Sequence, residues 1–120
     1  FYKALNVKQN LEMCYRLSDN IIDENRIQEL TKRLSLSHKL TSKINDLSAG
    51  ELQRLSLIRA ILLKPKIILA DEPTSALDDK NAHTTIQLLS ELSHENNSSL
   101  IIVTHDHRIS TVMNNRIILA

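Results

Sequence analysis

Glycine is nearly absent from this chain: Gly50 is the only one among 120 residues. Average usage of about 7% would give roughly eight. The phosphate-binding loops G-x-x-x-x-G-K-[ST] and G-x-G-x-x-G each need two or more glycines, so the sequence can form neither. Any contact that the chain makes with a nucleotide must therefore be made without a P-loop of its own.

Other scarce features narrow the class of protein. The single cysteine, Cys14, allows no internal disulfide and fits a reducing compartment. We expect it to be a small buried hydrophobe and not a reactive thiol. No apolar run exceeds the four residues of Leu100–Val103, which is far too short to span a membrane, and no signal peptide is visible. The net charge of +1 argues against a strongly basic surface for nucleic acid.

The remaining composition is that of one soluble globular domain, with 42% hydrophobic and 24% charged residues. The chain does not begin with Met. We therefore expect it to be a piece of a longer protein.

Residues 1–46 are predicted to be helical and rich in polar side chains. Two apolar stripes at spacings close to those of a helix indicate two helices, and Asp23 can cap the second. The stripes are Leu11, Tyr15 and Ile22, then Ile27, Leu30 and Leu34. The stretch Ser35–Asp46 has no clear period and is predicted to be a loop.

The second half alternates between helical and strand-like segments, which predicts a parallel α/β arrangement. The first helix is expected to turn one apolar side inward, formed by Leu52, Leu55, Ile58 and Leu62. The predicted elements are a helix Glu51–Leu63, a buried strand Lys66–Ala70, a turn Asp71–Asp78, a helix Asp79–Glu95, a buried strand Leu100–Val103, a short helix Asp106–Met113 and a third strand Arg116–Leu119.

Ser48-Ala49-Gly50-Glu51 opens the first of these helices. Ser48 with Glu51 three positions later is the pattern of a capping box, which on its own is the favoured interpretation. The alternative is an anion site, because a helix N-terminus with free N–H groups, a hydroxyl and a glycine attracts phosphate. The two are compatible, since a capped helix start can also face a ligand.

Asp71 and Glu72 end an apolar strand, at the edge where open α/β sheets bind ligands. One carboxylate can hold Mg²⁺ through water, and its neighbour can act as a base toward water. For an acidic pair alone, a solvated turn is the favoured alternative. His105 follows the next strand, near the same edge, where it could contact a γ-phosphate or an attacking water. The alternative there is a plain helix start capped by Thr104.

Taken in order, these segments resemble the C-terminal portion of an ATP-binding cassette (ABC) ATPase domain. Leu47–Arg54 resembles the ABC signature, with Ala49 and Glu51 in place of the commoner Gly and Gln. Ile67–Glu72 resembles Walker B, Ser75–Asp78 resembles the D-loop, and His105 resembles the switch histidine. The resemblance covers the whole chain and is nearest to the lipoprotein-release, macrolide and peptide exporter branch.

The resemblance implies a partial P-loop NTPase core with a RecA-like parallel sheet (47–120), preceded by an α-helical subdomain (1–46) that docks a membrane subunit. It also implies site roles. Ser48, Ala49, Gly50 and Glu51 would contact ATP held by a partner subunit, and Asp78 would lie at the dimer interface. Asp71 would hold Mg²⁺ through water, Glu72 would be the general base, and His105 would be the switch histidine.

The resemblance further implies a head-to-tail dimer with a second ATPase subunit, a membrane-spanning permease as partner, and a place at the cytoplasmic face of the membrane. No Walker A, adenine-stacking aromatic or Q-loop glutamine lies in the chain. We therefore expect these residues alone to be inactive and to self-associate through apolar sheet surfaces. The alternatives are a non-transport ABC ATPase of DNA repair or translation, and an interaction module without chemistry.

Overall fold

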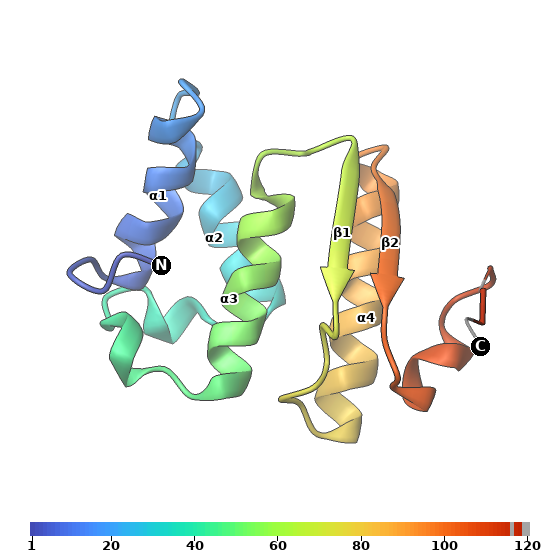
Figure 1. Cartoon of the computed structure of the whole chain (residues 1–120). Coiled ribbons are helices and arrows are strands. Elements are labelled where there is room, and N and C mark those ends of the chain that lie inside the picture. Colours follow the sequence, from blue (N-terminus) through green and yellow to red (C-terminus); the bar gives the residue numbers. More distant parts are fainter. Residues whose placement is uncertain (116, 119–120) are drawn as a thin grey trace.

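The computed structural model describes residues 1–115, 117 and 118. It shows helices and strands in the order expected of an α/β protein (Figure 1). The elements are α1 (Val7–Leu17), α2 (Glu24–Arg33), the 3₁₀ turns η1 (Ser37–Lys39) and η2 (Ile44–Asp46), α3 (Ala49–Leu62), β1 (Ile67–Asp71), α4 (Asp79–Glu95), β2 (Ser99–Val103) and η3 (His107–Thr111).

Polar side chains begin the α-helices. Asp23 caps α2 as predicted, by accepting a hydrogen bond from the N–H of Arg26. Asn6 and Gln9 form a capping box at the start of α1. Asp78 caps α4, which has the predicted bounds. These caps satisfy N–H groups that a helix start leaves without intrahelical acceptors.

Helix α3 lies between the N-terminal helices and the sheet (Figure 1), and it contacts α1, α2 and α4. The predicted apolar side is incomplete, because α3 buries Leu57 and Ile61 as well as the predicted Leu55, Ile58 and Leu62. One cluster of buried side chains takes in residues from both halves of the chain, from Val7 to Leu92.

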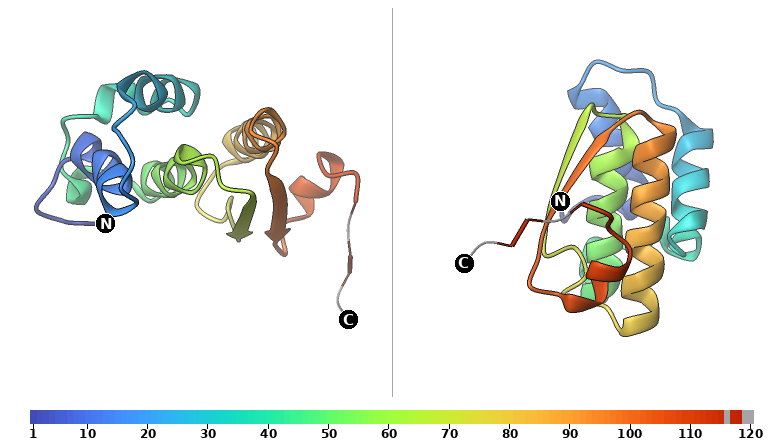
Figure 2. Two further views of the ribbon diagram at one scale, coloured as in Figure 1. Left: turned by 90° about the horizontal axis from the view of Figure 1, so that it is seen from above. Right: turned by 90° about the vertical axis from the view of Figure 1, so that its right-hand side faces the viewer.

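β1 and β2 pair in parallel, with Ile67 opposite Ser99 and Asp71 opposite Val103. Within the described residues the sheet has these two strands. The helices lie on one face of it, as the view from above in Figure 2 shows. The parallel pairing is confirmed, but the strands are not buried as expected.

The sheet face away from the helices, which we call the outer face, is apolar and open. Its side chains are 61% exposed at Ile67, 74% at Leu69, 52% at Ile101 and 59% at Val103. The opposite face packs inward, with Ile68 at 2% exposure. A fully buried parallel strand needs cover on both faces, and the described residues supply it on one.

Ion pairs and hydrogen bonds join α2 to α4. Arg33 contacts Glu95 at 3.1 Å and Glu91 at 3.5 Å. The guanidinium of Arg26 donates to the side chain of Asn96 at 3.3 Å. These contacts connect the predicted helical part of the chain to the predicted core.

The bounds of α3, β1 and β2 differ from the prediction by one or two residues at their ends. Three other predicted elements differ in type. The loop Ser35–Asp46 contains η1 and η2. The short helix expected over Asp106–Met113 is the 3₁₀ turn η3, which is shorter. Of the third strand expected over Arg116–Leu119, residues 116 and 119 lie outside the described residues, and 117–118 belong to no strand.

Candidate active site

The predicted site residues gather at one edge of the molecule. The carboxyl ends of β1 and β2 point to the same edge as the N-termini of α3 and α4 (Figure 1). This edge carries Ser48–Glu51, Asp71 and Glu72, Asp78, and His105. Residues as far apart in the sequence as 48 and 105 thus lie at one edge, because β1 and β2 are parallel and both α3 and α4 begin where the strands end.

The start of α3 is a capping box, as the favoured interpretation predicted. The N–H of Glu51 donates to Oγ of Ser48 at 3.2 Å, and the N–H of Ser48 donates to Oε2 of Glu51 at 2.8 Å. Lys39 approaches the Glu51 carboxylate at 3.5 Å. The pKa of Glu51 is lowered, chiefly by the N–H of Ser48 and further by Lys39.

This cap is compatible with anion binding at the same helix start. The N–H groups of Ala49 and Gly50 also lie in the first turn, where helix geometry provides no acceptor. The positive end of the helix dipole adds to their attraction for phosphate. The negative charge of Glu51 opposes it, although Lys39 offsets part of that charge.

Gly50 lies against the turn that follows β1. A Cβ added there would be 3.2 Å from Cδ2 of Leu77 and 3.4 Å from the carbonyl oxygen of Ala76. Within this chain, Gly50 therefore packs closely against the predicted D-loop segment. The sequence did not predict this contact.

Glu72 has a left-handed backbone, with φ of 45°. Its N–H donates to the carbonyl of Val103 at 2.8 Å. Its carboxylate accepts from the hydroxyl of Thr104 at 2.9 Å and from the N–H of His105 at 2.8 Å. Glu72 is thus held at the end of β2, half-buried, as a carboxylate with two donors.

Asp71 ends β1 and is exposed. Mg²⁺ in proteins is held by one or two carboxylates with several waters and substrate phosphates, so a single open carboxylate has suitable chemistry. In the part of the chain that the structure describes, no cluster of three or more His, Cys, Asp or Glu side chains could hold a metal. An ion here would need ligands besides these protein groups.

Asp78 caps α4, with the N–H of Asn81 donating to it at 2.8 Å. This N–H is the main cause of the lowered pKa of Asp78. The residue lies at the site edge and is exposed.

A second polar network, which the sequence analysis did not predict, connects η3 to the D-loop segment. Arg108 binds both carboxylate oxygens of Asp106 and also Asp79. The hydroxyl of Thr74, a fully buried residue, donates to Asp106 at 2.7 Å. The pKa of Asp106 lies well below its usual range because Arg108 and Thr74 donate to it. The only sequence signal was the capping potential of residues 104–106.

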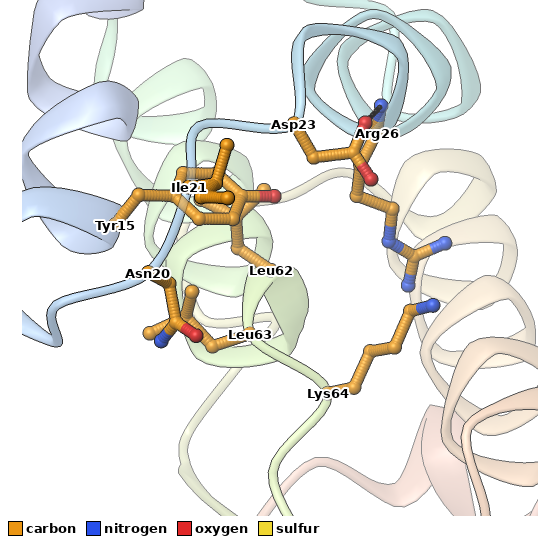
Figure 3. Close-up of a pocket in the computed structure, with 8 residues that line it drawn as sticks. All are labelled: Tyr15, Asn20, Ile21, Asp23, Arg26, Leu62, Leu63 and Lys64. Carbon is orange, nitrogen blue, oxygen red and sulfur yellow. Dashed lines mark hydrogen bonds between the residues drawn. The ribbon is translucent and has the colours of Figure 1, made fainter.

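A pocket of about 190 Å³ lies at the other end of α3, away from this edge (Figure 3). Arg26 and Lys64 line it together with Tyr15 and Asp23. None of the predicted site residues borders it. Among the described helices, none combines the length and apolar character needed to cross a membrane.

Comparison with known proteins gives consistent results. The family model described as "ABC transporter" matches residues 2–75. The lipoprotein-releasing system ATP-binding protein LolD of Acinetobacter baylyi is 47% identical over 83 residues, which is 69% of this chain and 36% of that protein. The ABC transporter ATP-binding protein YtrE of Bacillus subtilis is 35% identical over 111 residues, which is 91% of this chain and 48% of that protein.

Solved structures agree. The dimeric structure of MJ0796, a bacterial ABC transporter cassette, has a TM-score of 0.79 at 32% identity, covering 91% of this chain and 50% of that one. A post-hydrolysis dimer of MJ0796 bound to ADP and Pi has a TM-score of 0.76 at 34% identity, covering 87% of this chain and 47% of that one. The chain thus spans half or less of the length of these relatives.

Proposed function

The chain belongs to the ABC transporter family of ATP-binding proteins, and on that premise we propose that it is the C-terminal portion of the ATP-hydrolysing subunit of an ABC transporter. The observation that carries the proposal is the gathering of the signature-like helix start, the carboxylates after β1 and His105 at one edge. The similarity to LolD and YtrE supports the same assignment.

Within this proposal, Ser48, Ala49, Gly50 and Glu51 face the phosphates of ATP bound to a second subunit. The first-turn N–H groups and the Ser48 hydroxyl provide the donors. Asp78, at the same edge, lies at the dimer interface. The pairing with a second ATPase subunit is supported by the dimeric MJ0796 cassettes.

Glu72 takes the role of general base toward the water that attacks the γ-phosphate. Two donors, from Thr104 and His105, fix its carboxylate, and a fixed base is what in-line attack requires. His105 contacts the transferred phosphate or that water. Asp71 would hold Mg²⁺ through water, and the ion would neutralise charge on the phosphates.

The partners follow from the same proposal. Residues 1–46 form the helical subdomain that docks a membrane-spanning permease, and 47–120 form part of the ATPase core. The subunit lies at the cytoplasmic face of the membrane and drives export, because LolD relatives belong to a lipoprotein-releasing system. We further propose that these 120 residues alone are inactive, since no P-loop lies in them.

Two measurements test the proposal. Calorimetry on the 120-residue chain should show no micromolar binding of ATP, and tight binding would contradict the inactivity of the chain alone. The reading frame upstream of Phe1 should encode G-x-x-x-x-G-K-[ST] after a strand. If the longer protein co-purified with ribosomes or DNA and not with a permease, the transport assignment would be wrong.

A further inference from the structure

The side chain of Gln53 joins α3 to the turn after β1. Its Nε2 donates to the carbonyl oxygen of Glu72 at 2.9 Å and to Oγ of Ser75 at 3.2 Å. Its Oε1 accepts from the N–H of Ala76 at 3.1 Å. One half-buried amide therefore spans the turn from its first residue to its fifth.

The turn needs such support because Glu72 adopts a conformation unfavourable for a side chain with a Cβ. A non-glycine residue in a left-handed region costs on the order of 1 kcal/mol or more. Such a residue persists only where its surroundings hold it.

The groups that hold Glu72 come from different elements. Val103, Thr104 and His105 bind its N–H and carboxylate from the end of β2. Its carbonyl accepts from Ser75 within the turn at 3.3 Å. Among the hydrogen bonds of the described residues, Gln53 supplies the one that reaches Glu72 from α3.

We propose that Gln53 is a positioning residue: its amide sets the left-handed turn at Glu72 and thereby the place of the Glu72 carboxylate relative to the signature-like helix start. This inference rests on the proposed function of Glu72 as base. Gln53 lies one helical turn after Gly50, so the same helix that faces the partner's nucleotide holds the base of its own subunit.

The amide is suited to this role because it both donates and accepts. Glutamate at position 53 would keep the acceptor for Ala76 but would place a carboxylate oxygen against the carbonyl of Glu72. Methionine would keep the length and helix propensity of the side chain but make none of the three hydrogen bonds.

The test is a double-mutant cycle in the longer ATPase subunit, with Gln53→Met and Glu72→Gln made singly and together. We expect Gln53→Met to lower kcat about 10- to 100-fold with little change in KM for ATP. The reason is that a displaced reacting group slows the chemical step without weakening the binding of the substrate. In the Glu72→Gln background, Gln53→Met should change the residual rate little. An equal loss in both backgrounds would overturn the proposal, because Gln53 would then act independently of Glu72.

A matched control is Gln87→Met on the exposed face of α4, where the amide donates to Oε1 of Glu91 at 3.2 Å. It should leave kcat unchanged. Because Gln53→Met removes every bond at once, Gln53→Glu provides a second variant, with Tm measured for each. A loss of kcat that followed only the loss of folded protein would also overturn the proposal.

Hydrogen exchange on the 120-residue chain separates this inference from the proposed function. The amide of Ala76 should exchange roughly tenfold faster or more in Gln53→Met, because its acceptor is gone. The amide of Leu77, which donates to the carbonyl of Thr74 at 3.0 Å, should change less. Unchanged exchange at Ala76 would show that Gln53 does not hold the turn. If the longer subunit hydrolysed no ATP, the proposed function would fail and the positioning role with it, whatever the exchange result.

Discussion

Thr74 donates a 2.7 Å hydrogen bond from its hydroxyl to Oδ2 of Asp106, a residue 32 positions later. Thr74 is fully buried, and its carbonyl also accepts from Arg108 at 3.4 Å. The bond joins the turn after β1 to the turn after β2. The segments that carry Glu72 and His105 are therefore held together by this side-chain bond as well as by the pairing of the two strands.

Replacing Thr74 by Val should lower the free energy of unfolding by about 1–2 kcal/mol, because a buried donor to a charged acceptor is lost while the shape of the side chain is kept. Urea unfolding followed by circular dichroism measures this. Thr84→Val, at an exposed position of α4, is the control and should change stability by less than about 0.5 kcal/mol. Equal effects of the two substitutions would contradict the importance of the Thr74–Asp106 bond.

Gly50→Ala tests whether the glycine is required for folding or for a ligand. Ala is favoured over Gly in a helix by up to about 1 kcal/mol, while the new Cβ would press on Leu77 at 3.2 Å. These effects oppose each other, so we expect a net change in stability within about 1 kcal/mol in thermal or urea unfolding. In the longer subunit, ATPase activity should fall by more than stability explains. Ala60→Gly, at an exposed position further along the same helix and outside the proposed binding residues, is the matched control. Full activity of Gly50→Ala would argue against a close approach to phosphate.

Glu51→Gln should change how stability depends on pH. The folded-state pKa of Glu51 is lowered by the Ser48 N–H, so its ionised form stabilises the fold above the unfolded pKa of about 4.3. That advantage is lost as pH falls through the folded pKa. The wild-type chain should therefore be more stable than Glu51→Gln at pH 7, and the difference should shrink progressively below about pH 4.3. A difference that stayed constant from pH 7 to pH 3 would show that the capping carboxylate is not the cause.

Leu69→Lys should reduce self-association of the 120-residue chain. Leu69 is 74% exposed and pairs across the strands with Ile101, at the middle of the outer face. Contiguous exposed apolar surface of this kind favours association, and a charge opposes it. Light scattering should show oligomers for the wild-type chain and a smaller mass for Leu69→Lys.

The control for this prediction is Ile21→Lys, in the loop between α1 and α2, where Ile21 is 94% exposed. It should leave the mass unchanged, because Ile21 does not belong to the outer face of the sheet. A monomeric wild-type chain would contradict the prediction.

Several elements could be predicted because their signals are local. The bounds of α4 agree with the prediction, since Asp78 caps its start and its buried side chains recur at helical spacing. The capping box at Ser48 and Glu51 depends on residues three positions apart. The parallel pairing of β1 and β2 followed from the crossover helix between them.

Other features depend on contacts between distant residues and leave no local pattern. The sequence analysis did not single out Gln53 or Arg108, because their partners are distant in the sequence. Gln53 bonds to residues 19–23 positions away, and Arg108 bonds across the turn after β1 to residues 29–34 positions away. The two-sided burial of α3 arises from its place between α1, α2 and α4. The exposure of Leu69 and Ile101 depends on which elements cover the sheet, and a strand's own sequence cannot specify that.

By itself, the sequence determined the order of helices and strands, the capped helix starts and the family, because these depend on residue type and short spacings. It also excluded a P-loop within these residues, since that loop needs glycines and the chain has one. Only the tertiary structure decided what Gly50 and Glu72 contact. Gly50 packs on the turn at Leu77, and Glu72 is held by groups from β2 and α3. The physical reason is that hydrogen bonds and packing act over a few ångströms in space, between residues that the fold alone brings together.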